Sequence, residues 1–154
     1  MSSERPVTDM QKLMAALGNA MLHWCFLEDE LTEAIKRLRI ESEGSASRIR
    51  GTFGDRLSEW RGLLSQKTRR NPPLAEAVAD QANEIERLRT KRNLIAHNLA
   101  GADASPDESE PHVWCADRAA PGAGAERTQI SLADLDEMIQ AMDRCRYRVQ
   151  AIGR

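Results

Sequence analysis

Apolar residues recur at steps of three and four along four stretches of the chain, the spacing that places them on one face of an α-helix. This pattern predicts a long first helix over about residues 8–39 and a shorter second helix over about residues 49–67. A third helix is expected from the prolines at 72–73 to about residue 99, and a last one over about residues 132–152. The sequence therefore predicts an all-α bundle of about four main helices.

Two charged residues stand where this rhythm calls for apolar ones. In the first helix Glu28 falls between Trp24 and Leu31, and in the third helix Arg92 falls between Leu88 and Ile95. An unpaired charge on a packing seam is costly, so we expect Glu28 and Arg92 to pair across the two helices.

The region before the last helix has a different composition. Residues 101–111 are acidic, small and interrupted by proline, which predicts a flexible acidic loop. The short runs at 112–115 and 127–130 flank a segment with Pro121 and two glycines, and they suggest a small β-hairpin. The last helix is expected to begin after Ser131, with a carboxylate three residues further on.

Length and composition limit the class of protein. The chain has 154 residues, the usual size of one domain, so we expect a single domain over residues 1–154. Its three cysteines are widely spaced and form no CxxC pair, which argues against a disulfide framework or a zinc site. No stretch is apolar enough for a membrane span, and no leader segment is evident. A cytoplasmic protein without a cofactor or metal is expected.

The charge is unevenly distributed along the chain. Residues 48–92 hold 11 basic and 6 acidic side chains, a local charge of +5, while the remainder carries −7. Arg92 closes this basic portion. The neighbouring cluster of Arg87, Arg89 and Lys91 is usually just a solvated helix face, but it could also follow the backbone of an RNA.

Three residues of the third helix form a candidate catalytic group. Asn93 and His97 are four residues apart and so share a helix face, and the long side chain of Arg92 can swing toward them. Histidine can accept and donate protons near neutral pH, and arginine can bind phosphate oxygens. Attack of an RNA 2′-hydroxyl on the neighbouring phosphate needs these functions and no metal. One histidine per chain supplies one proton-transfer group, whereas a two-fold dimer would supply two.

The segment Arg92-Asn93-Leu94-Ile95-Ala96-His97 resembles the motif of the HEPN superfamily: an arginine, a polar residue, three further residues and a histidine. The resemblance extends in outline to the order of helices and hairpin. It implies a helical bundle that forms a homodimer, with Arg92 and His97 lining an interface cleft for metal-independent RNA cleavage and Asn93 supporting them. Some relatives are toxins paired with an antitoxin and carry a tyrosine two residues after the histidine, where this chain has Leu99.

Other interpretations of these residues stay open. The resemblance favours a protein that binds RNA or a nucleotide and acts as an endoribonuclease, with Arg92 and His97 catalytic and Asn93 and Glu28 supporting. The alternative is a non-catalytic HEPN-like module that dimerises and binds another protein. A purely structural role is the third: Arg92 would hold two helices together through Glu28, and His97 would simply end a helix. The tryptophans, Trp114 among them, are expected to be core or dimer contacts rather than base-stacking platforms.

Overall fold

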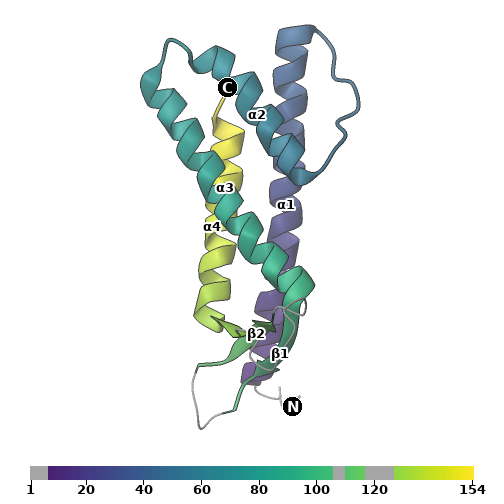
Figure 1. Ribbon diagram of the computed structural model, residues 1–154, viewed down its shortest axis with the longest axis vertical. Helices are drawn as coiled ribbons and strands as arrows, with labels where there is room; N and C mark the ends of the chain where they lie inside the picture. The colour runs from purple at the N-terminus through teal and green to yellow at the C-terminus, as the bar shows by residue number, and fades with distance from the viewer. Residues whose placement is uncertain (1–6, 106–109, 117–126) are drawn as a thin grey trace, which may run out of the picture. The chain divides into compact units, whose positions relative to one another are not determined.

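The computed structural model of the protein describes residues 7–105, 110–116 and 127–154 and is mainly helical (Figure 1). Its elements in chain order are α1 (Asp9–Glu43), α2 (Phe53–Thr68), α3 (Pro72–Asn98), β1 (Leu99–Asp103), β2 (His112–Ala116), β3 (Arg127–Ser131) and α4 (Leu132–Ala151). The four predicted helices are therefore confirmed, and a small antiparallel sheet precedes the last of them. None of the described helices is both long and apolar enough to cross a membrane.

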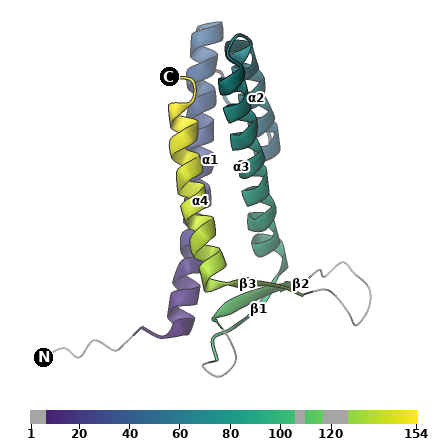
Figure 2. The same cartoon turned by 90° about the vertical axis from the view of Figure 1, so that its left-hand side faces the viewer.

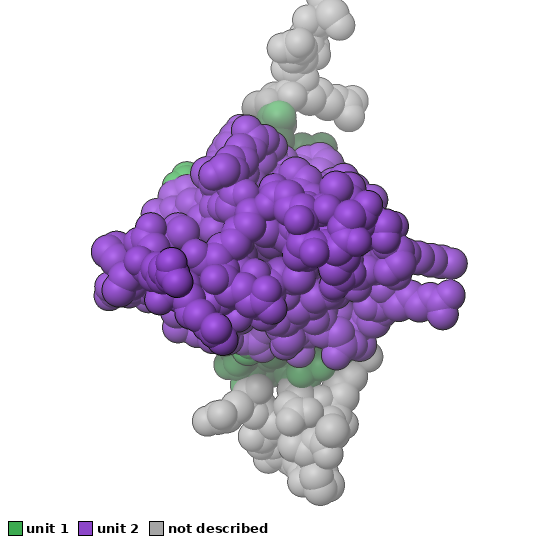
Figure 3. Space-filling view, turned by 90° about the horizontal axis from the view of Figure 1, so that it is seen from above, with its two compact units in different colours: residues 1–22, 90–140 green, residues 23–89, 141–154 purple. Residues whose placement is uncertain are grey.

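The chain divides into two compact units, which Figure 3 shows in different colours. Unit 1 comprises residues 1–22 and 90–140, and unit 2 comprises residues 23–89 and 141–154. The sheet and the motif residues at 92–97 belong to unit 1, while the whole of α2 belongs to unit 2.

Unit 2 has a core of large apolar side chains. Its residues with at most 6% exposure include Trp24, Leu27, Leu31, Ile35, Leu57, Trp60, Leu64, Ile85, Leu88, Met142 and Val149. Two polar residues of unit 2 are buried as well, Gln81 at 2% and Thr68 at 6% exposure. On α3, Gln81 shares its buried face with Ile85 and Leu88, which follow at helical steps of four and three. The spacing in α3 therefore identified its buried face.

The connection from α1 to α2 is defined by glycines and side-chain hydrogen bonds. Helix α1 continues to Glu43, beyond the predicted end near residue 39, and Gly44 follows with a φ of 74°. Helix α2 starts only at Phe53, because Thr52 caps it: the Thr52 hydroxyl accepts from the Asp55 amide at 3.2 Å and the Asp55 carboxylate accepts from the Thr52 amide at 2.8 Å.

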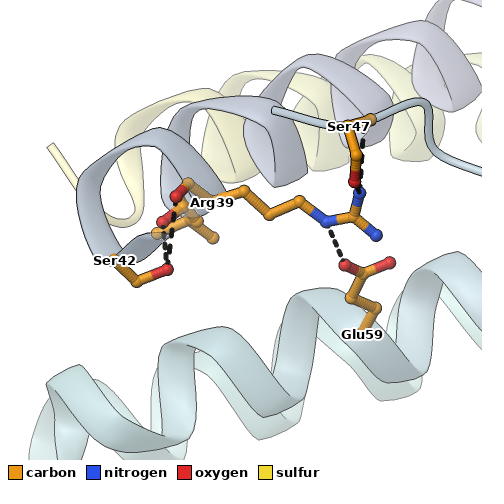
Figure 4. A network of polar contacts seen from close by, with 5 residues as sticks. Arg39, Ser42, Ser47 and Glu59 are labelled. Carbon is orange, nitrogen blue, oxygen red and sulfur yellow. Dashed lines mark hydrogen bonds and ion pairs between the residues drawn. The ribbon is translucent and has the colours of Figure 1, made fainter. Parts of the chain in front are cut away.

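Arg39 links this connection to both helices (Figure 4). Its Nε donates to Glu59 Oε1 on α2 at 2.5 Å, and its Nη1 donates to the carbonyl and the hydroxyl oxygen of Ser47, each at 3.1 Å. The hydrogen bond to Glu59 raises the pKa of the Arg39 guanidinium. The segment between α1 and α2, rich in serine and glycine, is thus tied to the helices at Ser47.

The sheet in unit 1 has the strand order β1-β2-β3, with both neighbouring pairs antiparallel (Figure 2). Val113 and Cys115 on β2 are 0% and 1% exposed, so one face of the sheet is covered. The pairing of β2 with β3 confirms the predicted hairpin. Strand β3 runs directly into α4, whose start Ser131 and Asp134 cap as predicted: the Asp134 amide donates to the Ser131 hydroxyl at 3.0 Å and the Ser131 amide to the Asp134 carboxylate at 2.9 Å.

The predicted acidic loop over residues 101–111 was wrong at its start, because residues 101–103 belong to β1. Small residues carried no strand signal there, yet their backbone pairs with β2 from Leu99 to Asp103, with an irregularity between Leu99 and Gly101. Residues 106–109, the most acidic part of that loop, lie outside the described residues.

The three cysteines are all free thiols, as expected. Cys25 is exposed, whereas Cys115 and Cys145 are buried at 1% exposure each. Burial raises the pKa of both the Cys115 and the Cys145 thiol, because a thiolate would lose its hydration there.

Candidate functional site

The motif residues occupy the last turns of α3, at the end where the helix passes into β1. Helix α3 begins at the two prolines, where the Asn71 side chain accepts from the Leu74 amide at 3.2 Å, and it ends at Asn98. Ile95 is 3% exposed and holds the buried face of the segment. The other residues of these turns are half-buried or exposed.

Arg92 and Asn93 are joined by a hydrogen bond. Arg92 Nη1 donates to Asn93 Oδ1 at 3.0 Å, and both residues are half-buried. The bond runs from a guanidinium donor to an amide oxygen and orients the guanidinium relative to Asn93. The structure thus brings together the predicted phosphate-binding residue and its predicted support.

His97 lies in the last turn of α3 and is exposed. It is four residues after Asn93, so the two side chains share one helix face, as the spacing predicted. An exposed imidazole at this position can be reached by a ligand or a second molecule. A position in the last turn is also what the third interpretation, a purely structural role in which His97 ends the helix, expects, so the exposure of His97 does not separate the two roles.

The buried stripe of α1 passes through Leu27, and the placement of Glu28 on the seam was wrong. Leu27 is 0% exposed whereas Glu28 is half-buried. Going from Trp24 to Leu31, a step of three followed by a step of four fits a helix as well as the reverse order, so the rhythm alone could not choose between the two residues. Glu28 lies in unit 2 and Arg92 in unit 1, so their predicted ion pair stays a prediction.

Two of the three residues in the basic cluster before the motif form ion pairs with glutamates of the same helix. Arg87 binds Glu84 through two hydrogen bonds of 2.9 and 2.8 Å, and Arg89 Nη1 binds Glu86 at 3.2 Å. These ion pairs lie on the surface of unit 2, where they are weak and exchange readily. Their carboxylates nevertheless reduce the net positive charge that this surface offers to an RNA.

Lys91 is half-buried in unit 1 and lines a cavity of about 170 Å³ beside the motif. The cavity is also lined by Leu94 and Ile95 of the motif, by residues 128–130 of β3 and by Asp134. Hydrogen bonds from Ser131 lower the pKa of Asp134, and the charge of Lys91 contributes in the same direction. Lys91 therefore faces a carboxylate of its own unit.

Sequence reasoning missed a second group of polar and aromatic residues, on the sheet. Asp103, His112, Trp114, Arg127 and Gln129 line a cavity of about 290 Å³. With Gly101, we call these residues the outer sheet face, because Val113 and Cys115 between them point to the covered face. The signal was present in the alternation of His112-Val113-Trp114-Cys115, since every second residue of a strand faces the same side.

Among the described residues, no group of three or more His, Cys, Asp or Glu side chains is placed to hold a metal ion. The motif itself presents a guanidinium hydrogen-bonded to an amide oxygen and an exposed imidazole. Compared with models of protein families, with curated proteins and with solved structures, the chain has no significant match in any of the three.

Proposed function

We propose that this chain is a HEPN-like protein that binds RNA and cleaves it without a metal ion, at a composite site formed by two copies. The observation that carries the proposal is the arrangement at the end of α3: the hydrogen bond from Arg92 to Asn93 and the exposed His97 on the same turns.

In this reaction His97 of one copy accepts the proton of an RNA 2′-hydroxyl, and the 2′-oxygen attacks the adjacent phosphorus. The bond from phosphorus to the 5′-oxygen breaks, and His97 of the second copy donates a proton to that leaving oxygen. The products are a 2′,3′-cyclic phosphate and a 5′-hydroxyl end. The guanidinium of Arg92 binds the phosphate oxygens, on which negative charge grows as the bond forms.

A homodimer is supported by an apolar stripe on the part of α1 that belongs to unit 1. Met10 and Met14 are 39% and 43% exposed, and they continue along the helix into Leu17 and Met21, both half-buried. Their spacing of three and four places them on one face, and nothing lies within 4 Å of the space beside Gly18. An exposed stripe of flexible methionines is typical of a surface that packs against another helix.

The test compares the wild type with His97→Ala and Arg92→Ala on a mixed pool of RNA, with and without EDTA. Loss of the general acid and base is expected to lower the cleavage rate by about 10² to 10⁴, and loss of the guanidinium by about 10² to 10³. His23→Ala and Arg144→Ala are the matched controls, because they make the same two substitutions outside the motif. His23 is half-buried in unit 2, and Arg144 is exposed on α4. Both controls should cleave like the wild type.

Two outcomes would contradict this mechanism. One is cleavage that survives His97→Ala, and the other is cleavage that EDTA abolishes. Sedimentation at micromolar concentration provides a separate check, because a clean monomer that still cleaves RNA cannot use a site composed of two histidines. A dimer that cleaves no RNA would favour the non-catalytic function instead.

A specific observation supports that second candidate function, a protein-interaction module. In unit 2 the aromatic residues Phe26 and Tyr147 are 38% and 58% exposed. The guanidinium of Arg146 lies 5.5 Å from the centre of the Phe26 ring and 5.2 Å from that of Tyr147. Exposed aromatic residues grouped with an arginine are typical of protein interfaces.

A further inference from the structure

The outer sheet face is organised in cross-strand rows. Trp114 lies opposite Gly101 on one side and Gln129 on the other, while His112 lies opposite Asp103. Directly opposed residues of an antiparallel pair point to the same face, and so do residues two apart along a strand. The register thus accounts for a single surface built from three strands, with Trp114 in its centre.

The ring of Trp114 lies against the backbone of β1. A Cβ atom on Gly101 would come within 2.2 Å of Trp114 Cζ2, so the absence of a side chain there makes room for the indole. The guanidinium of Arg127 lies over the indole, 5.6 Å from its centre, so a base that stacks on this face takes the place of the guanidinium. The imidazole of His112 lies 6.3 Å from the indole centre. Among the three tryptophans, Trp24 and Trp60 are at most 2% exposed, while Trp114 is half-buried.

The polar groups around this ring differ in what they can bind. The carboxylate of Asp103 is held by the Ser105 amide at 2.8 Å, and the hydrogen bonds from Ser105 lower the pKa of Asp103. At neutral pH it is therefore an acceptor only, with lone pairs left for further donors. Gln129 carries an amide that both donates and accepts, and Arg127 is a permanent cation. Both of these side chains are exposed.

One common ligand matches the indole, the carboxylate and the guanidinium of this face. A nucleobase offers a flat ring for stacking on an indole, and guanine alone among the four RNA bases presents two adjacent donors, N1–H and the N2 amino group, beside an acceptor oxygen. Two adjacent donors suit a carboxylate, and a 5′-phosphate suits an arginine. The cavity volume of about 290 Å³ is just below the range of about 300 to 1,000 Å³ that is usual for pockets of drug-sized ligands, which favours a small ligand.

We propose that the outer sheet face binds a guanine nucleotide, with the base stacked on Trp114, its N1 and N2 donors on the Asp103 carboxylate and its phosphate at Arg127. The base can come from a free nucleotide or from single-stranded RNA. This site is separate from the residues of the motif, so it does not depend on RNA cleavage.

The experiment measures binding of GMP, AMP, CMP and UMP to the full chain by titration calorimetry and by quenching of tryptophan fluorescence. GMP is expected to bind saturably and at least about tenfold more tightly than AMP, since a matched pair of hydrogen bonds to a base edge discriminates by about that factor or more. Oligouridine with and without one internal guanosine identifies the source: a guanosine-dependent gain shows RNA binding, and binding of GMP alone shows a free-nucleotide site.

Two variants test the assigned contacts. Asp103→Asn keeps the shape of the side chain and should weaken GMP binding about tenfold while leaving AMP binding nearly unchanged. Trp114→Leu should weaken the binding of all four nucleotides by about fivefold or more, because stacking does not depend on the identity of the base. Asp136→Asn is the control. Asp136 is exposed on α4, so this substitution removes the same charge at a position outside the outer sheet face. Circular dichroism establishes that each variant is folded.

Three results would overturn the proposal: no saturable binding of any of the four nucleotides at millimolar concentration, equal affinity for all four, or an unchanged preference for GMP in a folded Asp103→Asn variant. Because none of these measurements involves cleavage, their failure is distinguishable from failure of the ribonuclease proposal. A catalytically inactive chain can still bind GMP, and an active one can fail to do so.

Discussion

The contact between Gly101 and Trp114 makes a quantitative prediction about one methyl group. In Gly101→Ala the new Cβ would meet Trp114 Cζ2 at 2.2 Å and Cη2 at 2.6 Å, so either the indole or the strand must move. Overpacking of this kind typically costs about 1 to 3 kcal/mol, while replacing a strand glycine by alanine returns about 0.5 to 1 kcal/mol. The difference lies between about 0 and 2.5 kcal/mol, so the free energy of unfolding should fall by about 1 kcal/mol.

A second glycine provides the matched control. Nothing lies within 4 Å of a Cβ placed on Gly62, which is exposed in the middle of α2. Gly62→Ala should therefore raise the free energy of unfolding by about 0.5 to 1 kcal/mol, because alanine favours the helix. The same chemical change is thus expected to have opposite signs at the two positions.

The assay is urea denaturation followed by circular dichroism, with tryptophan fluorescence of the folded protein as a second readout. With an m-value of about 1 to 3 kcal/mol per M urea, 1 kcal/mol moves the unfolding midpoint by about 0.3 to 1 M, so both shifts are measurable. Gly101→Ala should also change the fluorescence, because Trp114 is the least buried tryptophan. If Gly101→Ala stabilises the protein as much as Gly62→Ala and leaves its fluorescence unchanged, the indole does not cover Gly101, and the reasoning about the outer sheet face fails with it.

Two further predictions concern α1 and the start of α4. Leu27→Ala should lower the free energy of unfolding by about 2 to 5 kcal/mol and the neighbouring Glu28→Ala by less than about 1 kcal/mol, as urea denaturation would show; equal losses would contradict the position of the buried stripe. Asp134→Ala should cost about 0.3 to 1 kcal/mol at pH 7, because the carboxylate accepts from Ser131 at the start of α4. The folded state lowers the pKa of Asp134, so this contribution is complete above the unfolded pKa of about 3.9 and is lost as the pH falls through the folded pKa. Wild type and variant should then differ at pH 7 and converge once the pH has fallen below the folded pKa of Asp134, and a difference that stays constant with pH would show that the charge is not responsible.

The helices could be predicted from the sequence because their apolar residues repeat over many turns. The phase of the repeat was harder to assign. In the first turns of α1 the buried positions are Leu13, Ala16 and Ala20, and alanine gives a weak signal, whereas Met10 and Met14 give a strong one on the exposed side. A second apolar stripe on the same helix therefore competed with the buried one.

The candidate site was predictable only as far as it is local. Arg92, Asn93 and His97 lie within two turns of one helix, so their spacing fixed which of them share a face. The outer sheet face depends on pairing between residues far apart in the chain, such as Trp114 with Gly101, and on a strand of small residues that has no β-branched side chain. The spacing of residue types along the sequence does not indicate which distant residues pair in a sheet.

The unequal burial of the three thiols makes this protein easy to label. At neutral pH a maleimide should react with Cys25 and leave the buried Cys115 and Cys145 unmodified, since only an accessible thiolate attacks the reagent. A nitroxide attached there would place one probe on α1 of each chain without any engineered substitution. Two copies in a symmetric assembly would then give a single distance in a pulsed electron paramagnetic resonance experiment, and that distance would restrict how the two first helices are arranged.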